Sequence, residues 1–223
     1  MADDEKYWNN VYDEFHKLKP SRHSVWNESS NPFFERLIPF LKHVGVKSIM
    51  DAGCGDGRNI EPLVKAGLDV VGVDISESAL KNCERRFKNK KNLKLVYNLL
   101  SSPKFKNESV DAIICDHVLV HIKNIDAVID NFFRILKKGG YILLEFTSPQ
   151  DSTFGKGKKL SANEFSQNGV YLRYFTIKDI YKMLNKFDIL CFTSEHYTDP
   201  PHGSGYIRKK RHNHHSYFVL AHK

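Results

Sequence analysis

The feature that most constrains the fold of this chain is a glycine-rich turn, Asp51-Ala52-Gly53-Cys54-Gly55-Asp56-Gly57, between a short apolar run and an amphipathic segment. Its three glycines allow the backbone to turn sharply, and they let a ligand approach the main chain without a Cβ in the way. A helix that follows such a turn points its free N–H groups at the ligand, which favours a phosphate or a carboxylate. We therefore predict a strand–turn–helix unit that binds an anionic group.

Short apolar runs alternate with amphipathic stretches along almost the whole chain. This alternation is typical of βαβ units around a mostly parallel sheet with helices on both faces. We predict a Rossmann-like α/β sheet of seven strands that ends in an antiparallel C-terminal hairpin. The expected strands are residues 48–51, 70–74, 93–97, 110–115, 141–146, 189–194 and 217–221. The expected helices fall within the first 20 residues, at 32–45, 58–66 and 125–136, after Ser76 and after Thr176.

The length of 223 residues suits one domain and is short for two. Within it we expect N-terminal helices with a candidate lid at 1–44, a ligand-binding core at 47–146, a candidate substrate lid at 147–175, and a helix with a hairpin at 176–223. The second lid is expected because its polar stretch from 148 to 169 is too long for a tight connection.

The composition narrows the class of protein. Hydrophobic residues make up 41% of the chain and charged residues 27%, which excludes a disordered or collagen-like chain. No apolar run approaches the roughly 18 residues of a membrane span, and the acidic start is unlike a secretory signal. The four cysteines form no Cys-x-x-Cys pair and are expected to be reduced. We therefore expect a soluble, cytoplasmic protein that binds no membrane, with a monomer as the default.

The positive charge is concentrated near the C-terminal end of the sequence. The net charge is +8, from 34 Lys and Arg against 26 Asp and Glu, and residues 201–223 hold five Lys or Arg and no acid. Such a segment can bind a polyanion such as a nucleic acid, or it can serve only solubility. Both interpretations stay open at this point.

The residues around the glycine-rich turn indicate which kind of ligand it binds. A dinucleotide fingerprint would place its last glycine at Arg58, where it is absent. Asp51 would repel a pyrophosphate and attract an ammonium group. Asp74 ends the second expected strand, 17 residues after Gly57, where a carboxylate can accept hydrogen bonds from a ribose diol. A ligand with an amino-acid end and a ribose is S-adenosylmethionine.

Four sequence blocks then resemble one family. They run from Asp51 to Asn59, from Val71 to Ser76, from Ser109 to Cys115 and from Leu136 to Leu144. In this order they closely resemble the class I S-adenosylmethionine-dependent methyltransferases over residues 47–146. The Gly-Arg-Asn end of the turn and the aromatic start at Tyr7 and Trp8 are also similar to the tellurite-resistance and thiopurine branch.

The resemblance implies roles for the residues that match its motifs. Asp51 and the glycine-rich turn would hold the methionine end, and Asp74 would bind the ribose. Asn98 stands where the family often has an acid for the adenine amino group, and an amide oxygen can still accept that bond. The full set implied for the cofactor is Asp51, Gly53, Cys54, Gly55, Gly57, Asp74, Ile75, Asn98, Leu99, Cys115 and Asp116.

Two histidines are candidate catalytic bases. His117 and His121 follow the fourth expected strand at i, i+4, so both would face the cleft on one helical turn. A neutral histidine can take a proton from an alcohol or acid acceptor, although methyl transfer does not require a base. The alternative is that one or both histidines only cap or pack.

Further side chains are candidates for binding the methyl acceptor. Aromatic residues near the start would cover the cofactor as a lid, or they would form ordinary core. Residues after the candidate substrate lid would contact the acceptor, or they would only pack in a strand. Arg58 would pair with a carboxylate of the site, or it would lie at the surface as a solvated group. The candidates for the substrate side are Tyr7, Trp8, Tyr12, Tyr171, Arg173 and His202, with Trp26 as a further lid residue.

The histidines near the C-terminal end raise the question of a metal. They lack the i, i+4 helical pairing of a zinc protease and lie in a basic segment, so we expect no metal site.

The function expected from the sequence is methyl transfer from S-adenosylmethionine to an O, N or S atom of a small molecule. Three alternatives stay open: a methyltransferase of tRNA or another nucleic acid, a non-catalytic cofactor-binding regulator, and a nicotinamide dehydrogenase. A nucleic-acid partner is not favoured, because the chain has no appended RNA-binding module.

Overall fold

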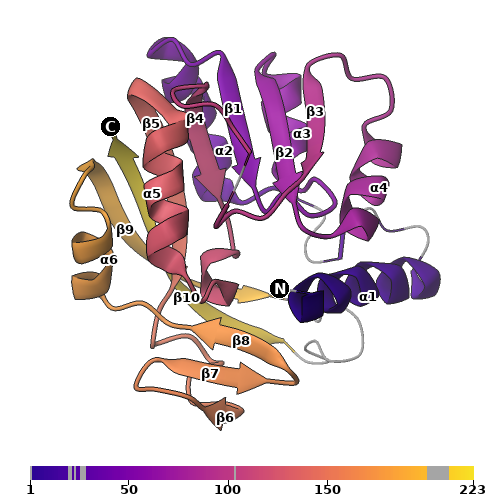
Figure 1. Cartoon of the computed structure of the whole chain (residues 1–223), viewed down its shortest axis with the longest axis vertical. Coiled ribbons are helices and arrows are strands. Elements are labelled where there is room, and N and C mark those ends of the chain that lie inside the picture. Colours follow the sequence, from indigo (N-terminus) through magenta and orange to yellow (C-terminus); the bar gives the residue numbers. More distant parts are fainter. Residues whose placement is uncertain (1, 20–21, 23, 26–28, 103, 200–210) are drawn as a thin grey trace.

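A computed structural model describes residues 2–19, 22, 24–25, 29–102, 104–199 and 211–223 of the chain. Seven strands form one sheet in the order β3-β2-β1-β4-β5-β10-β9 (Figure 1). They are β1 (Ser48–Ala52), β2 (Asp69–Asp74), β3 (Leu93–Tyr97), β4 (Val110–Cys115), β5 (Leu136–Thr147), β9 (Asp188–Asp199) and β10 (His212–His222). β1 to β5 are parallel, and β10 lies antiparallel between β5 and β9. The predicted Rossmann-like α/β class is confirmed.

The strand order brings the carboxyl ends of β1 and β4 together. Ile49 of β1 pairs with Val70 of β2 on one side and with Ala112 of β4 on the other. The chain therefore leaves β1 toward one edge of the sheet and later returns to its other side. In open α/β sheets, ligands bind at such a switch point, outside the carboxyl ends of the strands. The glycine-rich turn after β1 and the residues after β4 meet there.

Helices cover both faces of the sheet. They are α1 (Ala2–Leu18), α2 (Pro32–His43), α3 (Ile60–Lys65), α4 (Glu77–Arg86), the 3₁₀ turn η1 (Leu119–His121), α5 (Ile125–Ile135) and α6 (Ile177–Met183). Ala112 and Ile114 of β4 belong to the core shared with α2, α3 and α4, whereas Ile113 and Cys115 belong to the core shared with α5 and α6. Because β4 is buried on both faces, its sequence is nearly all apolar.

Local signals in the sequence set several helix starts. Asn31 accepts a hydrogen bond from Phe33 N and precedes Pro32 at the first helical position of α2. Ser76 caps α4, and Thr176 with Asp179 forms a capping box at α6, so both helices begin where the sequence predicted. α3 begins at Ile60 and not at Arg58, because the glycine-rich turn continues through Gly57 with a φ of 89°.

The polar stretch from 148 to 169, a candidate lid in which no strand was expected, contains regular structure. β6 (Lys158–Lys159) and β7 (Glu164–Gln167) join β8 (Val170–Arg173) in a separate antiparallel sheet, seen below the main sheet in Figure 1. β7 and β8 are linked by Asn168 and Gly169, whose φ angles are 52° and 84°. A two-residue Asn-Gly turn is a strong hairpin signal, so this part of the prediction was wrong for a reason that the sequence contains.

α1 lies against α4 near the glycine-rich turn. Phe15 of α1 shares a small core with Ala79 of α4. The Asn9 Oδ1 accepts hydrogen bonds from Ser76 Oγ at 2.9 Å and from Ser78 N at 3.1 Å. The predicted N-terminal helix with one apolar face is therefore confirmed, and polar contacts fix it over the first turn of α4.

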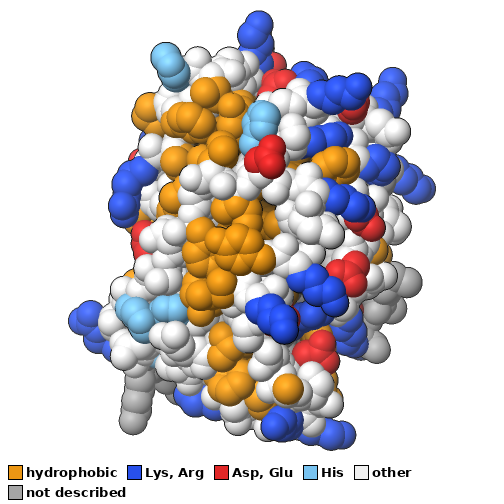
Figure 2. Space-filling view, turned by 90° about the vertical axis from the view of Figure 1, so that its left-hand side faces the viewer, with side chains coloured by type: hydrophobic (Ala, Val, Ile, Leu, Met, Phe, Trp, Pro, Cys, Tyr) orange, Lys and Arg blue, Asp and Glu red, His pale blue; other side chains and the backbone are white. Residues whose placement is uncertain are grey.

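β9 and α6 lie on the face of the molecule that Figure 2 presents. Tyr181 of α6 stacks on Phe192 of β9 at 5.7 Å between ring centroids, and Tyr181 and Leu190 are each 54% exposed. Hydrophobic side chains form a band along this face in Figure 2. Among the residues described, no helix combines the length and the apolarity that crossing a bilayer requires.

Candidate active site

The glycine-rich turn is closed against neighbouring elements. Gly53 N and Cys54 N donate to the carbonyl oxygen of Val73 at 2.7 and 3.0 Å, which ties the turn to the end of β2. Gly53 and Gly55 have φ angles of 82° and 55°, in the left-handed region that favours glycine. A Cβ at Gly53 would collide with Val118, and a Cβ at Gly55 would collide with the Tyr12 hydroxyl group. α1 and the segment after β4 therefore lie directly on the turn.

Asp74 is held in place by backbone donors. Its Oδ2 accepts from Gly55 N at 2.8 Å, and its Oδ1 accepts from Ser76 N at 2.9 Å. Burial raises the pKa of Asp74, and the hydrogen bonds from Ser76 and Gly55 oppose that rise. Each carboxylate oxygen has two lone pairs, so the group can accept further hydrogen bonds. Asn98 lies beside it, because Asn98 N donates to the Asp74 carbonyl at 3.0 Å.

Asp51 is the buried acid whose charge is least compensated. Its side chain lies at the end of β1 with 2% of the residue exposed, and its Oδ2 has no hydrogen-bond partner among the described residues. Burial, and then the charge of Asp116, raise the pKa of Asp51 to about 8, while Arg58 opposes the rise. A bound cation would stabilise the ionised carboxylate, so this site fits a ligand that carries an ammonium group.

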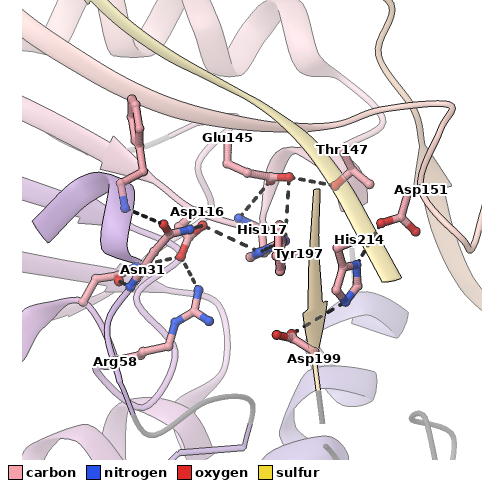
Figure 3. Close-up of polar contacts among 12 residues, drawn as sticks. Asn31, Arg58, Asp116, His117, Glu145, Thr147, Asp151, Tyr197, Asp199 and His214 are labelled. Atoms are coloured by element: carbon pink, nitrogen blue, oxygen red, sulfur yellow. Dashed lines mark hydrogen bonds and ion pairs between the residues drawn. The ribbon is translucent and has the colours of Figure 1, made fainter. Parts of the chain in front are cut away.

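Asp116 is compensated by several partners, as Figure 3 shows. Arg58 forms an ion pair with the Asp116 Oδ2. The side-chain amide of Asn59 donates to the same Oδ2 and that of Asn31 donates to the Oδ1, each at 3.0 Å. Burial alone would raise the pKa of Asp116, but Arg58 and the other donors outweigh burial and lower it. Arg58 is therefore the partner of a site carboxylate and not a solvated surface group.

His117 lies between a buried carboxylate and a phenol (Figure 3). Its backbone has a φ of 56°, and its N–H donates to the Glu145 Oε2 at 3.2 Å. Its ring places Nδ1 3.7 Å from the Glu145 Oε1 and Nε2 2.8 Å from the Tyr197 hydroxyl. Burial, and then the charges of Glu145 and Asp116, raise the pKa of Tyr197, so the phenol keeps its proton. A neutral His117 can accept that proton in a hydrogen bond at Nε2.

His121 has different surroundings from His117. Its Nδ1 lies 3.1 Å from the Tyr171 carbonyl oxygen, which can only accept, so Nδ1 carries the proton. Its ring contacts Trp8 of α1 at 4.9 Å between centroids. Burial lowers the pKa of His121 to about 4, although the Tyr171 carbonyl opposes the shift. The 3₁₀ turn begins after His117, so the two histidines do not share one helical face as predicted.

The predicted acceptor residues are only partly brought together. Tyr12 and Trp8 lie over the glycine-rich turn and His121, and Tyr7 packs edge-on against Trp8 at 5.1 Å. The Tyr171 hydroxyl donates to Glu164 at 2.7 Å, and Arg173 lies 4.0 Å from the same carboxylate, so both side chains are engaged in the small sheet. His202 and Trp26 lie outside the described residues.

The two cysteines implied for the cofactor site are buried thiols. Cys54 follows Gly53 in the glycine-rich turn, and Cys115 ends β4. A hydrogen bond with Cys83, and then burial, raise the pKa of Cys54, whereas burial is the main cause that raises the pKa of Cys115. Both thiols are therefore protonated, which makes them poor nucleophiles.

Sequence reasoning missed several residues that complete the site. Glu145 is fully buried and also accepts from Thr147 Oγ1 at 3.0 Å. An acid at the end of the apolar β5 run was a signal that could have been read, because β5 neighbours β4 in the predicted sheet. Asn31 and Tyr197 come from α2 and β9, and their approach to the site depends on tertiary packing that no local pattern reveals.

Comparison with known proteins agrees with this geometry. Residues 50–144 match the family described as "Methyltransferase domain". This segment of the chain is therefore similar in sequence to a methyltransferase domain. A solved S-adenosylmethionine-dependent methyltransferase from Methanosarcina mazei superposes on this domain with a TM-score of 0.67 and 20% identity, covering 83% of this chain and 97% of that one.

Two curated relatives differ in their named substrates. A ubiquinone biosynthesis O-methyltransferase of Hydrogenovibrio crunogenus is 28% identical over 153 residues, which cover 64% of this chain and 63% of the relative. The tRNA N(3)-methylcytidine methyltransferase trm140 of Schizosaccharomyces pombe is 29% identical over 215 residues, which cover 83% of this chain and 64% of the relative. This chain therefore spans less than two thirds of the length of each.

Proposed function

We propose that this chain is an enzyme that transfers the methyl group of S-adenosylmethionine to an O, N or S atom of a small-molecule acceptor. The observation that carries the proposal is the buried carboxyl group of Asp51, which lies at the switch point of the sheet with its pKa raised to about 8. Such a group is stabilised by a ligand that brings a positive charge, and the α-ammonium group of S-adenosylmethionine has that charge.

The chain offers a residue for each part of the cofactor. Asp51 would accept from the ammonium group, Asp74 would accept from the ribose hydroxyls, and Ile75 would pack on the adenine. Asn98 would accept from the adenine amino group. When bound, S-adenosylmethionine supplies an electrophilic methyl group on a sulfonium, and the protein aligns the nucleophile with it. The remaining residues of the proposed set are Gly53, Cys54, Gly55, Gly57, Leu99, Cys115 and Asp116.

Among the two candidate bases, the geometry favours His117 over His121. Glu145 lies 3.7 Å from the His117 Nδ1, where it would stabilise the imidazolium formed when Nε2 takes a proton from an acceptor hydroxyl. His121 has a pKa of about 4 and is a weak base. The Tyr197 hydroxyl lies at the His117 Nε2. The hydroxyl group of the acceptor would either displace the Tyr197 hydroxyl from this position or form a hydrogen bond with it.

Calorimetry tests the cofactor part of the proposal. S-adenosylhomocysteine should bind the full chain in a 1:1 complex and NAD should not. Asp51→Asn should weaken binding by about tenfold or more, because a hydrogen bond between two charged groups contributes roughly 1.5–3 kcal/mol. Asp69→Asn is the matched control, since Asp69 is an exposed acid on the neighbouring β2. Binding of NAD in place of S-adenosylhomocysteine would replace the proposal with a dehydrogenase.

Release of S-adenosylhomocysteine from a panel of acceptors tests the activity. Phenols come first, because of the relatives named for ubiquinone biosynthesis, followed by amines and thiols. His117→Gln should lower kcat for a hydroxyl acceptor about 10²–10⁴-fold with little change in cofactor affinity. His43→Gln, an exposed histidine on α2, is its control. Binding without turnover on every class would identify a regulatory module.

A tRNA acceptor is the second candidate, and two observations favour it. The relative trm140 matches 83% of this chain. A hollow between α1, α3 and α4 is lined by basic side chains, with Glu61 as its acid; these are Arg22, Lys65, Arg85, Arg86 and Lys90. Binding to tRNA that weakens steeply with salt, together with methylation of tRNA, would establish this candidate. Absence of both would leave the small-molecule acceptor.

A further inference from the structure

The hairpin of β9 and β10 brings two histidines and an acid together beside the candidate active site. His212 and His214 are two residues apart on β10, so their side chains share one face of the strand, and Asp199 of β9 pairs with His212. Donor atoms of the three side chains all lie within 4.8 Å of one another, and the three residues are partly buried. The sequence was expected to hold no metal because these histidines lack helical pairing, but a regular strand brings them together equally well.

Asp151 fixes the orientation of His214. The His214 Nδ1 lies 2.8 Å from the Asp151 Oδ2, as Figure 3 shows. Asp151 also accepts hydrogen bonds from Thr153 N at 2.8 Å and from His215 N at 3.2 Å, which is the pattern of an ionised carboxylate. An ionised carboxylate can only accept, so the His214 Nδ1 donates to Asp151, and Nε2 is the nitrogen that faces Asp199.

The His214 Nε2 lies 3.7 Å from the Asp199 Oδ2. Two ligand atoms of one tetrahedral zinc ion lie about 3.4 Å apart when each bond is about 2.1 Å long. The two atoms are therefore close enough together to bind one such ion. A carboxylate that accepts from the far nitrogen of a metal-binding histidine is a recurring arrangement in metal sites.

We propose that Asp199, His212 and His214 form a binding site for a divalent transition-metal ion of the Zn²⁺ class, with Asp151 as the positioning residue for His214. Two imidazoles and one carboxylate are the donor set that such ions accept, with room for water or an exogenous ligand. The His214 ring lies 5.1 Å from the Tyr197 ring and 6.0 Å from the His117 ring, between centroids, so the ion would stand next to the proposed acceptor site.

The test is a titration of the full chain after removal of metals with a chelator. Zn²⁺ followed by calorimetry should show one saturable site, and Co²⁺ should show the visible absorption of a bound, low-symmetry ion. His212→Ala and Asp199→Asn should each weaken Zn²⁺ binding by at least about 100-fold. Asp151→Asn keeps all three ligands and should weaken binding about 10–100-fold, which a purely structural role of Asp151 would not do.

Two controls keep the outcome decisive. His196 is an exposed histidine on β9, and His222 lies at the other end of β10, where it pairs with Asp188. Their alanine variants should bind Zn²⁺ like the unchanged chain, and the far-ultraviolet circular dichroism spectrum reports that every variant is folded. No saturable Zn²⁺ binding, or binding that survives His212→Ala and Asp199→Asn but is lost in His196→Ala, would overturn the proposal. Because the titration uses no cofactor, its failure is independent of any failure of methyl transfer.

Discussion

The two acids at the carboxyl ends of β1 and β4 are both buried but differ in charge compensation. Asp116 has the Arg58 guanidinium and two side-chain amides, and its pKa is lowered. Asp51 lies near the same Arg58, yet burial and the charge of Asp116 raise its pKa to about 8. The site therefore has one acid that stays ionised and one that is protonated at neutral pH until a cation arrives.

The affinity for S-adenosylhomocysteine should depend on pH through Asp51. Its pKa of about 8 means that the free protein binds a proton there at pH 6–7, and the ligand's ammonium group displaces it. Affinity should rise roughly tenfold per pH unit from pH 6 and level off near pH 8. Calorimetry in buffers of different ionisation enthalpy should show a proton released on binding. Asp51→Asn should remove the dependence, and a constant affinity across this range in the unchanged chain would contradict the assignment.

His121 should make the fold sensitive to acid. Its pKa is about 4 in the folded protein against 6.5 for the ordinary side chain, so the unfolded chain binds more protons between these values. The free energy of unfolding should therefore fall as the pH is lowered from 6.5 toward 4, by about 1–3 kcal/mol from this residue. Urea denaturation of His121→Gln across this range should show a shallower loss. His43→Gln, at an exposed position, should leave the loss unchanged.

The residues that sequence reasoning found are those that end strands or form the turn. Asp51 and Asp74 could be predicted because a parallel sheet places strand ends at one edge. Tyr197 and His214 could not, because their place depends on the register between β9 and β10, which the sequence leaves open. The sequence allowed two roles for Arg58, as the partner of a site carboxylate or as a surface group. Its ion pair with Asp116 decides for the first role.

At the scale of elements, α1 lies directly on the glycine-rich turn. Tyr12 lies against Gly55, and Trp8 lies against His121, so a ligand at the turn would contact this helix. The helix is anchored at Asn9, whose side chain accepts from the cap residue of α4 and from Ser78 N. Its role as a lid remains a prediction that these contacts support.

Asn9→Ala should loosen this lid. It removes two hydrogen bonds that contribute about 1 kcal/mol each, so S-adenosylhomocysteine should dissociate about 5–30-fold faster. Stopped-flow displacement measures the rate, and limited proteolysis should cut within the first 18 residues sooner. Asn10→Ala is the matched control, because Asn10 is the next residue of the same helix and is exposed. Equal dissociation rates in both variants would show that Asn9 does not hold the lid.

The elements of the parallel half were predicted closely, and those of the second lid were not. The strand from 110 to 115 was predicted with the bounds that the structure gives, because burial on both faces makes it continuously apolar. β7 (Glu-Phe-Ser-Gln) has one apolar residue and β8 (Val-Tyr-Leu-Arg) has three in a row, so neither strand shows a period-2 pattern. The local signal for this hairpin is the Asn-Gly turn that links the two strands.

At the scale of the whole molecule, β10, which is late in the sequence, packs against α2, which is early in the sequence. Phe218 of β10 is 1% exposed and packs against Phe33 and Phe34 of α2, at 4.9 and 6.0 Å between ring centroids. The core on the α2 side of the sheet is therefore completed only by a residue that lies far along the sequence.

Phe218→Ala should destabilise the fold by about 3–5 kcal/mol, the usual cost of removing a buried aromatic ring. Leu190→Ala should change the free energy of unfolding by no more than about 0.5 kcal/mol, because Leu190 is 54% exposed on β9. Chemical denaturation of both variants provides the comparison. A loss below about 1 kcal/mol in Phe218→Ala would mean that the α2 face does not depend on the hairpin.

The position of β10 inside the sheet also has a consequence for synthesis on the ribosome. β5 emerges long before residues 212–222, and until they arrive its outer row of N–H and C=O groups has no neighbouring strand. An unpaired row of this kind is a template for pairing with other chains. The edge of β5 is thus open to pairing with other chains until β10 has left the ribosome and joined the sheet.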